Sequence, residues 1–467
     1  MKKSDYIYFI PILFWAICYF GFSFDGLYGQ DAYEYVRFSN SLHNYFISDT
    51  LPGDYFWGIY YPLLGSLLTF IVGNTALALQ LISVISLTIT GIYIRKIIAF
   101  LYSEKPNDIV VFLCFCLSPM VFIHSVLVMS DMLTCCLIVL SIYHFLSFLE
   151  GSKNKSFYLG SIFCMLAVLT RYVAVVLLVP FAIMVFLKAF KSKKFKLLFL
   201  TLPILLIVSL PHFLVKSQNS LQFLSHSWLQ NWNIINLFKS DFITVEGPRN
   251  NHFINLIYVL YQLLHPIFFS YLIFLLPSFF KKDFYKTNTN QNIILISILL
   301  FSLFMGGIPY QNKRYLLPSF ILILIFMYPH LNKITFVNNK KLLYSFVFFT
   351  QMSLILFFGK QFYDRNVLEK EMVIEMEKYQ GKILYVFDID VALQGRGLHF
   401  TYKNLFLQKY TKYEQEALVL INEKQLEEQW KEKNPLINWE NIQQKCVLMK
   451  LKTSDKNWSL YKITALR

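Results

Sequence analysis

Apolar runs recur along the first 360 positions of the chain, and short polar segments separate them. Most of these runs approach the roughly 20 residues that an α-helix needs to cross a bilayer. The pattern predicts a polytopic helical membrane protein. The first run lacks a small-residue cleavage site, so we expect it to be retained as a helix. We predict eleven spans, at residues 6–24, 75–98, 107–124, 131–149, 157–170, 172–190, 197–215, 253–280, 291–308, 315–331 and 342–359.

The two spans within residues 157–190 are short, and one long tilted helix is the alternative. A single helix would place the basic segment "KAFKSKKFK" on the external side and invert every later span. Because cytoplasmic loops carry an excess of Lys and Arg, this outcome is unfavourable. The charge pattern therefore favours two short spans that meet near Arg171.

Basic residues are unevenly divided between the two sides that this topology defines. Eighteen Lys and Arg residues fall in loops on the side of the N-terminus, and seven fall on the other side. The positive-inside rule then predicts a cytoplasmic N-terminus. We interpret the formal net charge of +15 mainly as a topology signal, and we expect no nucleic-acid partner.

Composition supports the membrane assignment and excludes several classes of protein. The chain is 56% hydrophobic and 15% charged, with a mean hydropathy of +0.48, whereas soluble domains are about 25% charged. Neither GxxxxGK[ST] nor GxGxxG occurs, so the sequence predicts no nucleotide-binding glycine loop. Six of the seven cysteines fall inside predicted spans, and no Cys/His spacing resembles a zinc site.

The pattern changes in two external loops and after residue 359. The first loop, residues 25–74, contains two apolar segments that are too short to span, which predicts helices lying in the interface. The second loop, residues 216–252, is polar and rich in Asn. Residues 360–467 alternate short β-rich runs with charged helical stretches, which predicts a small external α/β domain. Residues 1–359 then form the membrane module.

Three ionisable residues follow the first span within seven positions, in "GLYGQDAYEYVRFS". On a helix that starts near Asp31, Glu34 and Arg37 lie at i+3 and i+6, roughly on one side. Asp31 has two interpretations. It is either the N-cap of that helix, or a carboxylate at the water–lipid boundary that acts as a general base for a hydroxyl acceptor.

A second acid, Asp131 in "HSVLVMSDMLTCC", opens the fourth predicted span on the same external side. Either Ser130 or Asp131 suits a helix N-cap. Ionisable groups at membrane depth are costly, however, and they often mark function. His124 lies seven residues earlier, and we assign it a structural or supporting role.

Basic side chains interrupt the external turns at Arg171, Lys313 and Arg314. A cation that extends to the membrane surface is the simpler interpretation, and we favour it for Lys313. Arg171 and Arg314 are lone guanidinium groups on the side where positive charge is sparse. Their planar fork suits a phosphate held beside the membrane. Carboxylates and guanidinium groups at a lipid boundary suit group transfer from a lipid-linked phosphate.

The order of these motifs resembles the GT-C glycosyltransferases that use polyprenyl-phosphate sugars, such as protein O-mannosyltransferases and lipid A aminoarabinose transferases. The resemblance covers roughly residues 1–330 and rests on five segments: "GQDAYEYVRF", "YYPLLGSLL", "SDMLTCCLIVLSIY", "LTRYVAVVLLVP" and "QNKRYLLP". It implies a GT-C membrane fold of about eleven helices. It also implies catalytic positions at Asp31 and Asp131. Substrate-binding positions would be Glu34, Arg37, Tyr61, His124, Arg171, Lys313, Arg314 and Tyr315.

The mechanism implied by the resemblance is inverting transfer to a lipid, glycan or protein acceptor on the external face of a bacterial inner membrane. Asp31 would accept the proton of the acceptor hydroxyl, and arginine would meet the charge of the departing polyprenyl phosphate. Some relatives need a divalent metal such as Mg or Mn, and this sequence leaves the metal site unknown. Two alternatives remain open: a flippase for lipid-linked sugars, and an enzyme similar to an O-antigen ligase.

Overall fold

The computed structural model describes residues 3–216, 227–244, 247–250, 252–269, 271, 275, 287–332, 340–430, 433–453 and 457–467. By contacts the chain divides into two compact units. The first unit comprises residues 1–27, 35–244 and 249–361, and the second comprises residues 28–34, 245–248 and 362–467. Parts of the predicted loop 216–252 and of the predicted span 253–280 lie outside the described residues.

The first unit is helical, and its N-terminal part contains the predicted first span and the two helices predicted for the first loop. Residues 29–34, at the start of the first of these two helices, belong to the second unit. The span consists of a 3-10 turn (η1, Lys3–Phe9), α1 (Ile10–Ala16) and a π-helical turn (η2, Ile17–Gly21). The loop helices are α2 (Gly29–Ser48) and α3 (Tyr60–Val72). Gly73 ends α3 in the left-handed conformation, where glycine has no steric penalty.

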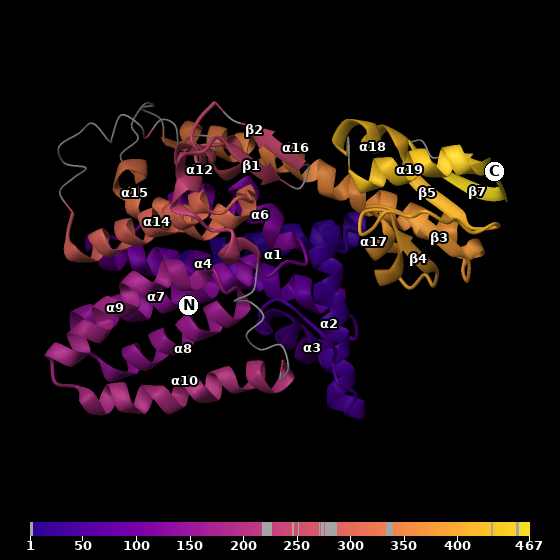
Figure 1. Ribbon diagram of the computed structural model, residues 1–467. Helices are drawn as coiled ribbons and strands as arrows, with labels where there is room; N and C mark the ends of the chain where they lie inside the picture. The colour runs from indigo at the N-terminus through magenta and orange to yellow at the C-terminus, as the bar shows by residue number, and fades with distance from the viewer. Residues whose placement is uncertain are drawn as a thin grey trace. The chain divides into compact units, whose positions relative to one another are not determined.

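The core of the first unit is built around α7 (Asp131–Gly151). This helix packs against α4 (Thr75–Tyr102), α8 (Asn154–Thr170) and α9 (Ala174–Lys191) (Figure 1). The side chain of Asn74 caps α4 by accepting a hydrogen bond from the Leu77 amide, which satisfies an otherwise orphaned donor. Because neighbours surround it, α7 is apolar on every face.

The predicted span 107–124 is a broken helix. It consists of α5 (Asp108–Val111), a π-helical turn (η3, Phe112–Cys116) and α6 (Pro119–Val126), and the two halves are bent by 68°. Pro119 is the cause, because proline lacks an amide donor and drives the preceding residue out of the helical region. Ser118 accordingly has ψ of 126°.

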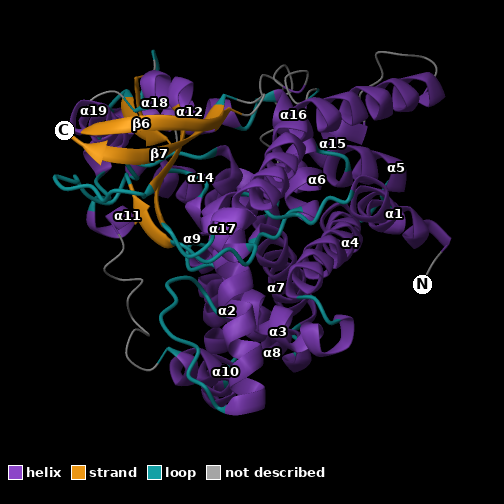
Figure 2. Ribbon diagram, turned by 90° about the vertical axis from the view of Figure 1, so that its right-hand side faces the viewer, coloured by secondary structure: helices purple, strands orange, loops and turns teal. Residues whose placement is uncertain are grey.

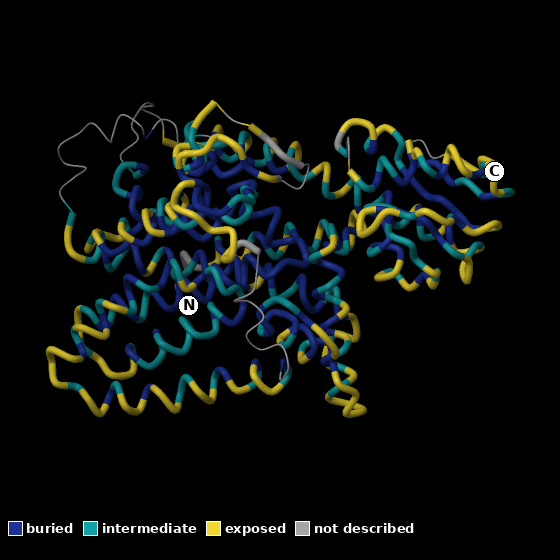
Figure 3. Tube along the Cα trace, in the orientation of Figure 1, coloured by how far each residue is buried: buried dark blue, intermediate teal, exposed yellow. Residues whose placement is uncertain are grey.

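The apolar stretch 157–190 forms two helices, as the charge pattern favours. α8 ends at Thr170, and Arg171 is extended, with φ −145° and ψ 114°. After α9, the basic turn leads into α10 (Phe195–Val215). Most of α10 is exposed (Figure 3), including the apolar side chains of Phe199, Leu206 and Ile207. Such a continuous apolar surface is expected of a helix that faces lipid.

The next elements follow in chain order: α11 (Ser227–Gln230), η5 (Ile234–Phe238), β1 (Asp241–Thr244), β2 (Gly247–Asn250), α12 (Asn255–Gln262), α13 (Pro266–Phe269), α14 (Thr289–Gly307), η8 (Lys313–Leu316), α15 (Leu317–Asn332) and α16 (Lys340–Met376). They belong to the first unit, except that β2 and α16 each have residues in both units. Within the described residues, seven helices are long and apolar enough to span, or eight if the bent pair is one span. The count of eleven stays a prediction. The helix α16 runs without a break across the predicted domain boundary at residue 359.

The second unit contains a five-stranded sheet in the order β4-β3-β5-β7-β6 (Figure 2). Its elements are η9 (Glu377–Tyr379), β3 (Ile383–Val386), α17 (Asp390–Gly395), β4 (Thr401–Asn404), β5 (Leu418–Asn422), α18 (Glu423–Gln429), α19 (Asn434–Lys445), β6 (Cys446–Thr453) and β7 (Trp458–Leu466). β3 pairs in parallel with both β4 and β5. The sequence analysis missed β4 because its residues "TYKN" contain no apolar run.

Candidate active site

A buried ion pair lies where α7 begins. Asp131 is 2% exposed, and its Oδ1 accepts a charge-assisted hydrogen bond from Nη1 of Arg171. The break between α8 and α9 gives Arg171 the extended backbone that directs its side chain to this point. Oδ2 of Asp131 is buried and has no hydrogen-bond partner among the described residues. The carboxylate therefore has an acceptor atom left over for a further donor.

A second guanidinium lies close to this pair. Arg314, on η8, directs Nη1 at the sulfur of Met129, 3.5 Å away. The guanidinium carbons of Arg314 and Arg171 lie 5.2 and 5.7 Å from the centre of the Tyr315 ring. A shared aromatic ring attracts both cations and keeps them together despite their mutual repulsion. Two guanidinium groups against one carboxylate leave this cluster with a net positive charge, which suits an anionic ligand.

Two tyrosines brace the segment before Asp131. The hydroxyl groups of Tyr35 and Ser130 are 2.7 Å apart, so Ser130 does not cap α7 with its side chain. The hydroxyl of Tyr61 lies 2.9 Å from Ser83 Oγ, which donates to the carbonyl of Met129. The Tyr35 and Tyr61 rings meet edge-to-face at 5.0 Å. These contacts fix the backbone on which Asp131 stands.

His124 is buried in α6, where Nδ1 lies 2.8 Å from the Met120 carbonyl one turn earlier. This is a local contact within its own helix. It agrees with the structural role that we expect, although the role stays a prediction.

The first-loop residues are placed on α2. The helix begins at Gly29, so Asp31 lies inside the first turn rather than at the N-cap. A carboxylate there is stabilised by the helix dipole. Asp31 and Glu34 are half-buried and belong to the second unit. Arg37 is exposed, and its Nη2 donates to the Asp54 carbonyl at 2.7 Å, which holds the loop.

A buried lysine that the sequence analysis counted only as a loop charge supports the same region. Lys216 is 5% exposed and donates from Nζ to the carbonyls of Phe56 and Trp57, at 2.7 and 3.3 Å. Nζ also lies 3.3 Å from the hydroxyl of Tyr172, the neighbour of Arg171. Burial lowers the pKa of Lys216 from 10.5 to about 8. A lysine directly after a long apolar helix, on the side poor in basic residues, was the signal available in the sequence.

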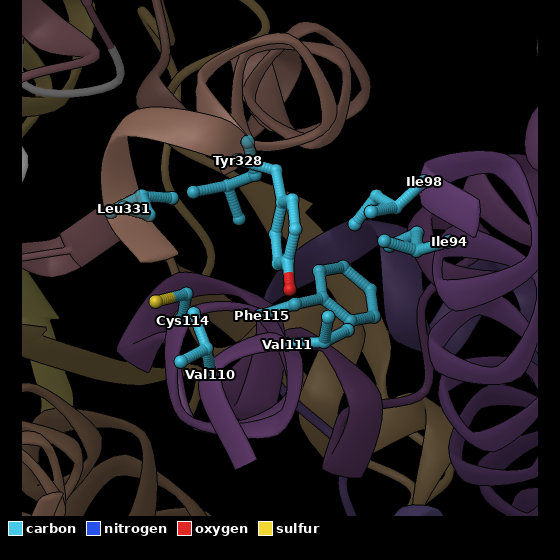
Figure 4. Close-up of a pocket in the computed structure, with 9 residues that line it drawn as sticks. Ile94, Ile98, Val110, Val111, Cys114, Phe115, Tyr328 and Leu331 are labelled. Atoms are coloured by element: carbon cyan, nitrogen blue, oxygen red, sulfur yellow. The ribbon is translucent and has the colours of Figure 1, made fainter. Parts of the chain in front are cut away.

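Two further features concern metal ligands and cavities. Among the described residues, no three His, Cys, Asp or Glu side chains lie close enough to hold a metal ion. An apolar pocket (Figure 4) is lined by Ile94, Ile98, Val110, Val111, Cys114, Phe115, Leu324, Tyr328 and Leu331. Ile94 lies eleven residues after Ser83 on α4, about 16 Å along the helix, so this pocket is remote from the Asp131 cluster.

Parts of the chain match a known protein family, and its fold matches solved structures. Residues 58–214, less than half of the chain, match the family described as dolichyl-phosphate-mannose-protein mannosyltransferase. The matched segment includes Tyr61, His124, Asp131 and Arg171, whereas Asp31 and Arg314 lie outside it. No curated protein matches the chain.

Two solved structures share the architecture over nearly the whole length. ArnT from Cupriavidus metallidurans bound to undecaprenyl phosphate matches with a TM-score of 0.64 and 11% identity, over 98% of each chain. ArnT from the same organism in the apo state matches with a TM-score of 0.61 and 10% identity, over 96% of this chain and 97% of that one. The chain therefore shares the fold of these ArnT structures. The expected fold class is thereby confirmed. The family match and the shared fold together indicate a membrane-embedded glycosyltransferase.

Proposed function

We propose that this chain transfers a sugar from a polyprenyl phosphate to an acceptor hydroxyl at the external face of the bacterial inner membrane. The observation that carries the proposal is the buried Asp131–Arg171 pair with Arg314 beside it on the Tyr315 ring. A phosphate is the ligand that two converging guanidinium forks bind best. The match to ArnT bound to undecaprenyl phosphate supports the choice of lipid phosphate.

The reaction needs one proton acceptor and one site for a leaving anion. Asp31 accepts the proton of the acceptor hydroxyl, whose oxygen attacks the anomeric carbon and forms the new glycosidic bond with inversion. The bond from that carbon to the phosphate oxygen breaks, and the electron pair leaves with the polyprenyl phosphate. Arg171 and Arg314 stabilise the negative charge that develops. Phosphate is a good leaving group, so the step requires no general acid.

Asp131 acts in this proposal through Arg171. Its Oδ1 is already engaged by the guanidinium, so its role is to orient the fork toward the phosphate. Glu34, Arg37, Tyr61, His124, Lys313 and Tyr315 remain proposed substrate-site residues. For Tyr61 and Tyr315 the described contacts support a role in shaping the cluster. The acceptor is a lipid, a glycan or a protein with an accessible hydroxyl. The orientation with a cytoplasmic N-terminus and an external C-terminal unit is part of the proposal.

The test compares the native protein with Asp31→Asn at matched levels in membranes. A panel of polyprenyl-phosphate hexoses and pentoses is supplied, and release of free polyprenyl phosphate is followed by mass spectrometry. We expect release by the native protein with one donor class and a loss of about 10³-fold in Asp31→Asn, because the missing base contributes roughly that much. Asp49→Asn, in the same external loop, serves as the matched control and keeps native release.

Equal release by Asp31→Asn would contradict the catalytic role. No release with any donor, combined with movement of lipid-linked sugar across the bilayer, would instead support a flippase.

A further inference from the structure

Tyr33, two residues after Asp31, is held by a buried polar network in the second unit. Its side chain is 3% exposed, and its hydroxyl donates to Oε2 of Glu369 on α16. The same hydroxyl accepts a hydrogen bond from Nε of Arg396 at 2.8 Å. The ring lies against Gly395, where an added Cβ would come within 2.3 Å of Tyr33 Cδ1. The contact is therefore close enough to require glycine at position 395.

The network extends from Tyr33 to the edge of the sheet. Glu369 is 1% exposed and accepts from Nε of Arg365 at 2.8 Å, with Nη2 of Arg396 at 3.5 Å. Arg365 also pairs through Nη1 with Asp388 at 2.8 Å and donates through Nη2 to the Asp388 carbonyl at 2.9 Å. Asp388 follows β3 at the carboxyl end of the parallel strands. β4 lies on one side of β3 and β5 on the other, and such an edge is where open α/β sheets place ligands.

Holding two segments together with charged side chains costs hydration free energy. Glu369 and the two guanidinium groups lose much of their hydration, whereas the side chain of Asp388 is 34% exposed. Well-packed apolar residues of the same volume would often stabilise as much or more. What the charged set adds is a single defined geometry, because each hydrogen bond fixes both distance and direction. Through Tyr33, these hydrogen bonds fix the position of the first turn of α2. The rings of Tyr28 and Phe362, with centres 4.5 Å apart, anchor the residue just before that turn.

We propose that Tyr33, Glu369 and Arg396 form a positioning clamp for the turn of α2 that carries Asp31. The inference rests on the proposed function, in which Asp31 is the base. The clamp residues do not contact the acceptor; they hold the backbone from which Asp31 projects. Without them, the first turn of a helix frays readily because its amides have no partners within the helix. The second unit thereby contributes to catalysis indirectly, by positioning Asp31.

The experiment measures both the local order of the turn and turnover, on the full-length protein in lipid nanodiscs. Tyr33→Phe removes one hydroxyl and keeps the ring, and Glu369→Gln keeps the shape of the side chain and removes its charge. The matched controls are Tyr45→Phe, later on α2, and Glu375→Gln, also on α16. Glu375→Gln loses only a surface ion pair with Lys452 of β6. Amide hydrogen exchange is followed over residues 29–34, together with kcat and donor KM.

We expect both clamp variants to speed exchange over residues 29–34 about tenfold and to lower kcat about tenfold, with donor KM within about twofold of native. The split arises because the phosphate is bound by Arg171 and Arg314 in the proposed function, and both residues are unchanged in these variants. The controls keep native exchange and native kcat. Glu369→Asp, which retains the charge, recovers part of the lost kcat.

Unchanged exchange in both clamp variants would overturn the inference. So would faster exchange with native kcat, if Asp31→Asn is inactive in the same assay, and the proposed function would then still stand. Full activity of Asp31→Asn would contradict the proposed function itself. This result comes from turnover alone and does not depend on the hydrogen-exchange data.

Discussion

At the scale of single residues, the proposed chemistry depends on ionisable groups whose partners come from distant parts of the sequence. Asp131 meets Arg171 across 40 positions, and Tyr33 meets Glu369 across 336. Each pair is buried, so each loses much of its hydration on folding and depends on its partner for compensation. Removal of one partner leaves the other uncompensated, and this makes the pairs testable.

We predict strong coupling between Asp131 and Arg171. Asp131→Asn and Arg171→Gln should each reduce turnover about 100-fold, because either change disorders the phosphate fork. The double variant should lose far less than the product of the two single effects, since the first change already breaks the pair. Initial rates of polyprenyl phosphate release in the four proteins give the coupling. Effects that multiply independently would contradict the positioning role of Asp131.

Lys216 predicts a pH dependence of stability. Its pKa is lowered to about 8 in the folded protein against 10.5 ordinarily. Between these two values the unfolded chain holds a proton that the folded protein has released, so this residue makes stability rise with pH over that window. Thermal unfolding of the purified protein from pH 7.5 to 10.5 should show this contribution. Lys216→Met should remove it, and an identical pH profile in that variant would argue against a buried charge.

At the scale of elements, the breaks between helices are as important as the helices. The break at Arg171 positions its guanidinium group. The break at Pro119 starts the short helix α6, after which the chain leads to Asp131. The first loop is fastened to the first of these breaks. Gly58 approaches so closely that an added Cβ would lie 2.1 Å from the Leu169 carbonyl oxygen.

We predict that Gly58→Ala displaces the first loop and costs about 2 kcal/mol or more in stability, as other substitutions that overfill a packed interior do. Turnover should fall with it, because Lys216 and Arg171 hold the same region. The control is Gly151→Ala at the end of α7, where the nearest atom lies 3.8 Å from the added Cβ. Thermal unfolding and turnover of the two variants are compared. Equal stability of both would show that the loop tolerates the extra carbon.

At the scale of the whole molecule, the described residues contain seven or eight helices that meet the criteria for a span, and eleven spans are predicted from the sequence. The difference comes from helices such as α8, whose 17 residues are short for a crossing, and from the predicted span 253–280, which lies partly outside the described residues. The orientation of the chain across the membrane is set by the distribution of Lys and Arg between the two sides.

We predict that the first loop is external and that the basic turn after α9 is cytoplasmic. A cysteine introduced as Asp49→Cys should react with a membrane-impermeant thiol reagent in intact spheroplasts. Ser192→Cys should react only after permeabilisation, because the positive-inside rule keeps its lysine-rich turn in the cytoplasm. The native cysteines are buried or half-buried, so the background is low. The reverse pattern would invert the topology and place the Asp131 cluster on the cytoplasmic side.

The sequence by itself determined the membrane class, the positions of most helices, the break near Arg171 and the change to an α/β unit near residue 360. These features follow from local hydrophobicity, charge and proline, which act through neighbours in the chain. It also singled out Asp31, Asp131, Arg171 and Arg314 as candidate residues. Their types and topological side are visible in the sequence, whereas their pairing is not.

Only the tertiary structure decided which groups meet. Lys216 resembled an ordinary loop charge. Tyr33 lies more than 300 residues before Glu369 and Arg396, with no local pattern to connect them. β4 carries no apolar run, and parallel pairing with β3 alone makes it a strand. Burial and hydrogen bonding between distant segments depend on the packing of the whole chain, and a sequence pattern records only what each segment prefers alone.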